Sequence, residues 1–140
     1  MEVNHKLYKQ FAENFPIICV DGIIVKDGLY LLVQRKNEPL KGEWWVPGGR
    51  IYKGETLEKG FRRKVKEETG LDVRVIVRVG FYEEQFKKND LGIDSKHTIS
   101  VVFVATPIDA TQDIKLDKQS SDYKWSSYLP KRFKKQALKL

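Results

Sequence analysis

A spaced pattern between Gly49 and Leu71 constrains the fold of this chain more than any other feature. The glycine-rich segment 47–50 is followed by a stretch of helical composition over residues 56–69, and Gly70 stands where a helix would end. Acidic side chains recur on neighbouring helical positions, beneath a loop whose glycines let the backbone approach a ligand closely. This arrangement suits a protein that holds a divalent cation against a phosphate chain.

Apolar periodicity and turn residues predict the elements around this unit. We expect an amphipathic helix before Pro16, a helix after Pro130, and strands over residues 17–25, 29–35, 44–46, 73–79 (continued by 81–86), 99–105 and 123–125. The turn signal at 26–28 predicts that the first two strands form a hairpin. Loops are expected over 36–43, 87–96 and 109–122, and a turn over 47–49.

The stretch 56–69 is the best helix of the chain. Thr56 is expected to cap its start and Gly70 its end, while Leu57, Phe61 and Val65 should face the core. A helix that follows a glycine loop, with strands on both sides, predicts one mixed α/β domain over residues 1–140.

Composition narrows the class of protein. The net charge is +7, but much of the excess lies in the last ten residues, which favours a solvated basic face on a terminal helix. Attraction for anionic substrates such as nucleotides is the alternative, and specific nucleic-acid binding is not favoured. Cys19 lies in an apolar run and is expected to be a buried small hydrophobe. With no secretory signal and no run of about 18 apolar residues, we expect a cytoplasmic protein without a membrane partner.

The acidic end of the central helix carries the chemistry. Mg²⁺ prefers oxygen ligands and keeps several waters, so two carboxylates, a backbone carbonyl and substrate phosphates suffice to hold it. Glu67 and Glu68 supply the carboxylates, and an ion pair between Glu55 and Arg63 would tie the loop to the helix. Intrahelical ion pairs on a surface helix are the alternative, but the full set at this spacing argues against it.

This pattern resembles the Nudix box, G-x5-E-x7-R-E-U-x-E-E-x-G-U with U aliphatic. The matching residues are Gly49, Glu55, Arg63, Val65, Glu67, Glu68, Gly70 and Leu71. The resemblance implies a Nudix α/β/α sandwich with a mixed sheet, and hydrolysis of a nucleoside diphosphate linked to another moiety. It also implies Mg²⁺, with Mn²⁺ as the alternative, held by the Gly49 carbonyl, Glu67 and Glu68.

Lys64 is the single departure from the box, because the family writes a glutamate at this position as metal ligand or water-activating base. A lysine four residues before Glu68 would repel a second metal ion or form an ion pair with Glu68. Either way we expect fewer metal ions and no helix base. The alternative is that Lys64 extends to solvent and that Glu83 or Glu84 replaces the base.

Outside the box the chain resembles the GDP-mannose mannosyl hydrolase branch, which also lacks the helix glutamate and displaces the sugar at carbon. The matching stretches are Asp21, the run from Arg35 to Arg50, the helix start 55–58, and Gln119-x-x-Asp122-Tyr123-x-Trp125. The resemblance implies that Gln119 is a further Mg²⁺ ligand and that Arg35, Arg50 and Tyr123 bind the diphosphate. Asp21 would contact the sugar or help the base.

Physical chemistry supports part of this assignment. Displacement at an anomeric carbon releases a nucleoside diphosphate, so the main task is to stabilise charge growing on that group, and Arg35 and Arg50 flank the glycine loop. Two departures oppose a simple transfer. That branch has a histidine base after the glutamine, where this chain has Ser120, and serine alone is no base at neutral pH. Conversely, Glu67 is present although that branch commonly lacks it.

Three hypotheses therefore remain. The first is a Mg²⁺-dependent hydrolase of a nucleoside diphosphate sugar resembling GDP-mannose. The second is a pyrophosphatase that attacks phosphorus of ADP-ribose or a nucleoside triphosphate, with Glu83 or Glu84 as base. The third is a catalytically weak nucleotide-binding module, in which Lys64→Glu would restore activity. A homodimer is expected, because the N-terminal helix and loop 87–96 offer interface material and the resembled branch is dimeric.

Overall fold

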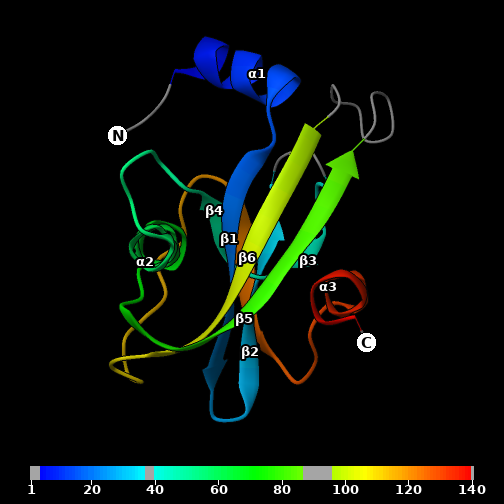
Figure 1. The fold of residues 1–140 in the computed structure, drawn as a ribbon. Coiled ribbons are helices and arrows are strands. Elements are labelled where there is room, and N and C mark those ends of the chain that lie inside the picture. The colour runs from blue at the N-terminus through cyan, green and yellow to red at the C-terminus, as the bar shows by residue number, and fades with distance from the viewer. Residues whose placement is uncertain (1–3, 37–39, 87–95, 140) are drawn as a thin grey trace.

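A curved mixed sheet forms the centre of the molecule, with helices on both of its faces (Figure 1). The structure is a computed structural model that describes residues 4–36, 40–86 and 96–139. Its elements in chain order are α1 (His5–Asn14), β1 (Ile17–Lys26), β2 (Leu29–Arg35), β3 (Trp44–Trp45), β4 (Gly48–Arg50), α2 (Leu57–Thr69), β5 (Val73–Phe86), β6 (Lys96–Pro107), β7 (Ser120–Ser126), α3 (Lys131–Phe133) and the π-helical segment η1 (Lys134–Leu138). The predicted α/β/α sandwich is confirmed.

Strand β1 lies in the middle of the sheet. The strand order is β3-β2-β1-β6-β5, and in addition β4 pairs with β1 and β7 pairs with β2. Strands β1 and β6 run parallel, while the other pairs are antiparallel. Because β4 pairs with β1, Gly48 lies opposite Asp21 and Gly49 opposite Val20. The start of the box is thus hydrogen-bonded to the central strand of the sheet.

Alternation along β1 and β6 builds two separate cores, one on each face of the sheet. On one face Val20 and Ile24 pack with Phe61 and Val65 of α2. On the other, Ile23 and Val102 join a cluster around Trp45 and Phe133 of α3, whose rings meet edge to face. Gly22 is needed in the first core, since a Cβ there would lie 2.4 Å from Cε1 of Phe61. Because β1 contributes side chains to both cores, it is covered on both faces of the sheet.

Local signals place α2 as expected. The Thr56 hydroxyl accepts a hydrogen bond from the Lys59 N–H, and Gly70 ends the helix in the left-handed conformation at φ 77°. Phe61 and Val65 are fully buried. The hairpin between β1 and β2 is also confirmed, with positive φ at Asp27 and Gly28.

Several expectations need correction. The turn predicted over 47–49 is wrong, because residues 48–50 form strand β4, which pairs with β1. The last strand begins at Ser120 instead of Tyr123, so the loop over 109–122 is shorter than expected. Of the loop predicted over 87–96, Lys96 begins β6, and the rest lies outside the described residues. None of the helices in the described ranges is long and apolar enough to cross a membrane.

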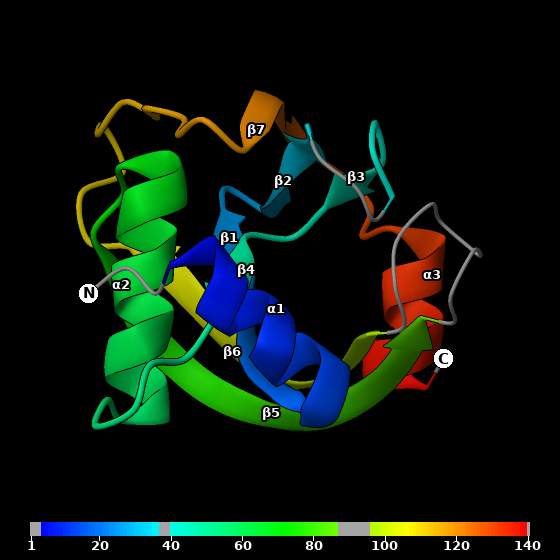
Figure 2. The same cartoon turned by 90° about the horizontal axis from the view of Figure 1, so that it is seen from above.

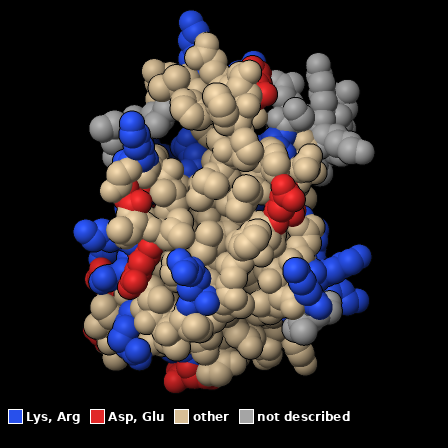
Figure 3. Space-filling model, viewed as in Figure 1, with Lys and Arg blue, Asp and Glu red and all other residues tan. Residues whose placement is uncertain are grey.

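Strand β5 departs from the alternating burial that its sequence indicates. It lies at the end of the strand order, and its register against β6 shifts between Val75 and Val77 and again between Arg78 and Gly80. Ile76, Val77, Val79 and Phe81 are therefore all exposed. On this face uncharged side chains cover most of the centre (Figure 3).

Candidate active site

A pocket of about 460 Å³ brings the box together with residues from almost every other element. Seen from above, α1 lies across the sheet between α2 and α3 (Figure 2), and His5 and Tyr8 of α1 line the pocket. The basic side chains on its wall are Arg35, Arg50, Lys64, Lys96 and Arg132. The acidic ones, among the described residues, are Asp21, Glu68 and Glu84. Among the lining residues that the structure describes, basic groups thus outnumber acidic ones, which suits an anionic ligand.

The two glycines of β4 allow its close approach to β1. A Cβ on Gly48 would lie 2.2 Å from the Val20 carbonyl oxygen and 2.3 Å from Oδ1 of Asp21. The Gly48 N–H donates a hydrogen bond of 3.1 Å to Oε2 of Glu68. The backbone of β4 therefore holds the carboxylate of Glu68 at the inner wall of the pocket.

Arg63 fixes the segment between β4 and α2, as the box predicts. Its Nε lies 2.6 Å from Oε2 of Glu55, and its Nη2 lies 2.9 Å from Oε1 of the same carboxylate. Nη2 also donates to the Arg50 carbonyl oxygen at 3.0 Å, and Nη1 to Oε1 of Glu67 at 3.1 Å. The bond from Arg63 holds the pKa of Glu55 below its usual range. Arg63 thus connects α2 to Glu55 through a bidentate pair, and to the end of β4 through the Arg50 carbonyl.

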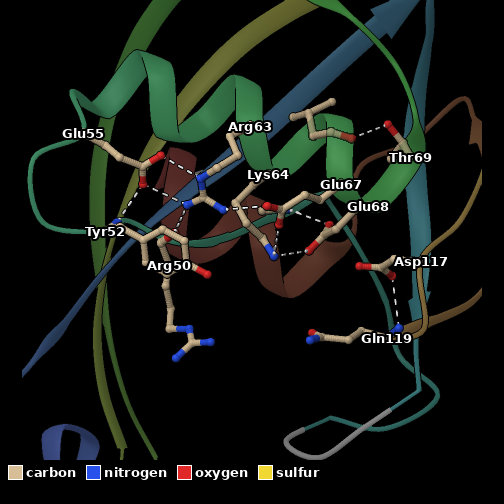
Figure 4. Close-up of polar contacts among 12 residues, drawn as sticks. Arg50, Tyr52, Glu55, Arg63, Lys64, Glu67, Glu68, Thr69, Asp117 and Gln119 are labelled. Atoms are coloured by element: carbon tan, nitrogen blue, oxygen red, sulfur yellow. Dashed lines mark hydrogen bonds and ion pairs between the residues drawn. The ribbon is translucent and has the colours of Figure 1, made fainter. Parts of the chain in front are cut away.

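Lys64 points back toward β4 instead of extending to solvent (Figure 4). Its Nζ lies 3.5 Å from Oε2 of Glu67 and 3.8 Å from Oε1 of Glu68. The side chain is 14% exposed, and its Cε lies 2.1 Å from the place that a Cβ on Gly49 would occupy. Of the alternatives that the sequence left open, the ion pair with Glu68 is the one observed.

Two buried carboxyl groups face the pocket. Burial raises the pKa of Asp21 to about 7, with the Glu84 charge adding to the rise, while the Tyr82 hydrogen bond and Arg35 oppose it. The Tyr82 hydroxyl donates to Oδ2 of Asp21. Burial likewise raises the pKa of Glu68 to about 8, opposed by the Lys64 charge and the Gly48 N–H. Both groups therefore exchange protons near neutral pH.

These shifts predict that the metal-free protein loses stability as the pH rises from 5 to 8. Both folded pKa values lie above the ordinary values of 3.8 and 4.5, so across this window the folded state keeps protons that the unfolded chain has released. The loss should be on the order of 1 kcal/mol or more per group, since one pKa unit corresponds to about 1.4 kcal/mol. Urea unfolding in EDTA measures it. Glu68→Gln should flatten the slope, and an equal slope in this variant would contradict the assignment.

The structure gathers most of the predicted site residues but not all of them. Seven line the pocket, namely Asp21, Arg35, Gly49, Arg50, Glu68, Glu84 and Gln119. The side chains of Arg50 and Gln119 point into the same space beneath Lys64 (Figure 4). Glu67 and Tyr123 are not among the lining residues: Glu67 is bound by Arg63 and Lys64, and Tyr123 is exposed on β7.

The two candidate bases separate on opposite sides of β5. Glu84 lines the pocket and forms an ion pair with Arg132. Glu83 does not line it, and its Oε2 lies 2.5 Å from Nε2 of His97. Because successive strand residues point to opposite faces, Glu84 is the candidate that the fold can use in this pocket.

Several pocket residues were missed by sequence reasoning. The Cζ atom of Arg50 lies 4.0 Å from the centre of the Tyr8 ring, and the Lys96 ammonium approaches the same ring. Arg132, which was assigned to a solvated basic face, instead stacks on Trp45 at 4.4 Å and pairs with Glu84. Cys19 lines the pocket too, and burial raises the pKa of its thiol to about 12, so it stays protonated. No local sequence pattern indicates these residues, because they reach the pocket only through tertiary packing of elements that lie far apart in the chain.

The donor groups of the pocket suit a divalent cation only in part. Within the described ranges, no three histidine, cysteine or acidic side chains gather into a metal cluster. Mg²⁺, however, binds through one or two carboxylates, waters and substrate phosphates. Glu68, Gly49 and Gln119 all line the pocket, and their carboxylate, backbone carbonyl and side-chain amide provide the oxygen donors that such a Mg²⁺ site uses.

Comparison with known proteins identifies the family. Residues 17–130 match the NUDIX domain model. The low-salt glycan biosynthesis protein Agl8 of Haloferax volcanii is 39% identical over 84% of this chain and 74% of its own. The ADP-ribose pyrophosphatase of Methanocaldococcus jannaschii is 38% identical over 83% of this chain and 66%, just under two thirds, of its own.

Solved structures agree with this match. The MutT protein of Methanosarcina mazei is 30% identical with a TM-score of 0.65, covering 80% of this chain and 78% of that one. A NUDIX hydrolase of Nitrosomonas europaea is 26% identical with a TM-score of 0.67, covering 80% and 72%. The family match over most of the chain, the sandwich fold and the box around Glu68 together show that this chain belongs to the Nudix hydrolase family.

Proposed function

We propose that this hydrolase cleaves a nucleoside diphosphate sugar resembling GDP-mannose into a nucleoside diphosphate and the free sugar, with Mg²⁺ as cofactor. The observation that carries the proposal is the ammonium group of Lys64 between Glu67 and Glu68. It stands where the family has a glutamate, so a helix base for attack at phosphorus is missing. Displacement at the sugar carbon needs leaving-group stabilisation more than a strong base.

The charges of the pocket support this reaction. Water attacks the anomeric carbon, the bond from that carbon to the diphosphate oxygen breaks, and both bonding electrons leave with the diphosphate. Arg35 and Arg50 both line the pocket and would bind the growing negative charge. Lys96 and Arg132 extend the same basic wall.

Asp21 is the proposed acceptor of the proton from water. It lies on the pocket wall with a pKa near 7, which suits general-base catalysis at neutral pH. Gly49, Glu68 and Gln119, with Glu67 nearby, would hold Mg²⁺, which when bound would neutralise charge on the diphosphate. The relative from Haloferax volcanii is named for glycan biosynthesis, which agrees with a sugar-bearing substrate.

A pyrophosphatase that attacks phosphorus is the second candidate. Glu84 lines the pocket and could activate water there, and one relative is named as an ADP-ribose pyrophosphatase. In this reaction water attacks a phosphorus atom and a P–O bond of the phosphate chain breaks, so that ADP-ribose would give AMP and ribose 5-phosphate, and a nucleoside triphosphate would give a monophosphate and pyrophosphate. Glu84→Gln should then abolish turnover, whereas the first proposal allows substantial activity to remain.

Product analysis with Mg²⁺ tests these proposals. GDP-mannose, ADP-ribose and a nucleoside triphosphate are offered in parallel, and the products are separated by ion-exchange chromatography. We expect GDP and mannose from the first substrate. GMP and mannose 1-phosphate would instead support the second candidate, and no turnover of any sugar nucleotide would contradict the first.

A further inference from the structure

Each carboxylate at the acidic end of α2 already has a cationic partner without any metal. Lys64 Nζ lies 3.5 Å from Glu67 and 3.8 Å from Glu68, so it stands between the two groups. Arg63 binds the other oxygen of Glu67 at 3.1 Å. The second oxygen of Glu68 accepts the Gly48 N–H. The negative charges of Glu67 and Glu68 are thus stabilised by cationic side chains and a backbone N–H alone.

The position of the Lys64 side chain is enforced by packing. Its stem lies over Gly49, where a Cβ would come within 2.1 Å of Cε. The side chain is 14% exposed, against 53% for Lys66 on the same helix, which pairs with Asp72 instead. A lysine that was merely solvated would resemble Lys66. Lys64 is held beside the backbone whose carbonyl the box assigns to metal binding.

The charge balance shows what this cation does to the site. Among the five residues joined by these ion pairs, and with Glu55, Glu67 and Glu68 ionised, three negative charges stand against two positive ones from Arg63 and Lys64, a net charge of −1. A glutamate in place of Lys64 would give four negative charges and one positive, a net charge of −3. Divalent cations are attracted far less to the first arrangement than to the second.

We propose that the Lys64 ammonium is a built-in cation that replaces one metal ion of this site and limits the protein to one bound divalent cation. The inference rests on the proposed use of a divalent metal here, but on neither candidate substrate. It makes Lys64 a positioning residue, which holds Glu67 and Glu68 in place in the metal-free state. The remaining ion would be held at the Glu68 side of the pocket.

Metal titration tests the inference without any substrate. Isothermal titration calorimetry with Mn²⁺, checked by electron paramagnetic resonance of the free ion, should show one Mn²⁺ per chain in the wild type. Lys64→Glu should bind one more, and Lys64→Glu with Glu68→Gln should lose that gain. Lys66→Glu is the matched control, because it makes the same charge change on an exposed position of the same helix. It should leave the stoichiometry at one.

Thermal unfolding provides a second readout. Lys64→Met keeps the length of the side chain but removes the cation, so Tm should fall in EDTA and recover on adding Mg²⁺, while Mg²⁺ changes the wild-type Tm much less. The inference is overturned if the wild type binds as many Mn²⁺ ions as Lys64→Glu, or if neither binds any. Failure of the substrate proposal alone would leave the predicted metal counts intact, so the two failures are distinguishable.

Discussion

Replacing Glu68 with glutamine is expected to lower kcat by about 100-fold, the scale of losing one preorganised electrostatic group in an active site. Glu68 is 8% exposed, and its carboxylate accepts the Gly48 N–H and lies beside Lys64 on the pocket wall. Glutamine keeps its shape but removes the negative charge that the proposed metal and Lys64 both need. Steady-state kinetics on the substrate found by product analysis measures the effect.

Glu58→Gln serves as the control for this variant. Glu58 lies in the first turn of the same helix and is exposed, so the same chemical change there should leave kcat unchanged. Circular dichroism should show that both variants fold. Full activity of Glu68→Gln would remove this carboxylate from the site.

Replacing Arg63 with methionine is expected to cost about 2–3 kcal/mol of unfolding free energy, the scale of breaking a partly buried, bidentate ion pair that also carries backbone contacts. Arg63 makes a bidentate pair with Glu55 and also bonds the Arg50 carbonyl and Glu67. Its loss leaves Glu55, which is 19% exposed in its side chain, without its main partner. Turnover should also fall, because the strand end that carries Arg50 loses its anchor.

A double-mutant cycle with Glu55→Gln separates the pair from other effects. If the pair carries the stability, the double variant should cost less than the two single variants added together. Arg62→Met is the control, since Arg62 is the exposed neighbour on the same helix. Equal losses for Arg62→Met and Arg63→Met would contradict the anchoring role.

The sequence predicted those parts of the fold that depend on local signals. Thr56, Gly70 and the apolar stripe of α2 determine that helix by themselves, and Asp27-Gly28 determines the first hairpin. Strand β4 escaped prediction because its three residues become a strand only through pairing with β1, more than twenty residues away along the chain. Its glycines indicate a turn when they are considered alone.

The site shows the same division between local and long-range information. The box places Arg63, Lys64 and Glu68 on one helix, and its spacing could be read directly. Whether Lys64 pairs with Glu68 or reaches solvent depends on the space over Gly49, which only the packed structure defines. Tyr8 and Arg132 enter the pocket from the two ends of the chain, so no spacing rule could reveal them.

The most direct test of the proposed reaction is hydrolysis of GDP-mannose in ¹⁸O-labelled water with Mg²⁺. If Lys64 has removed the base for phosphorus attack and the basic pocket stabilises the leaving diphosphate, mass spectrometry should find the label in mannose and none in GDP. Label in a phosphate product would contradict carbon displacement and would assign the water-activating role to Glu84.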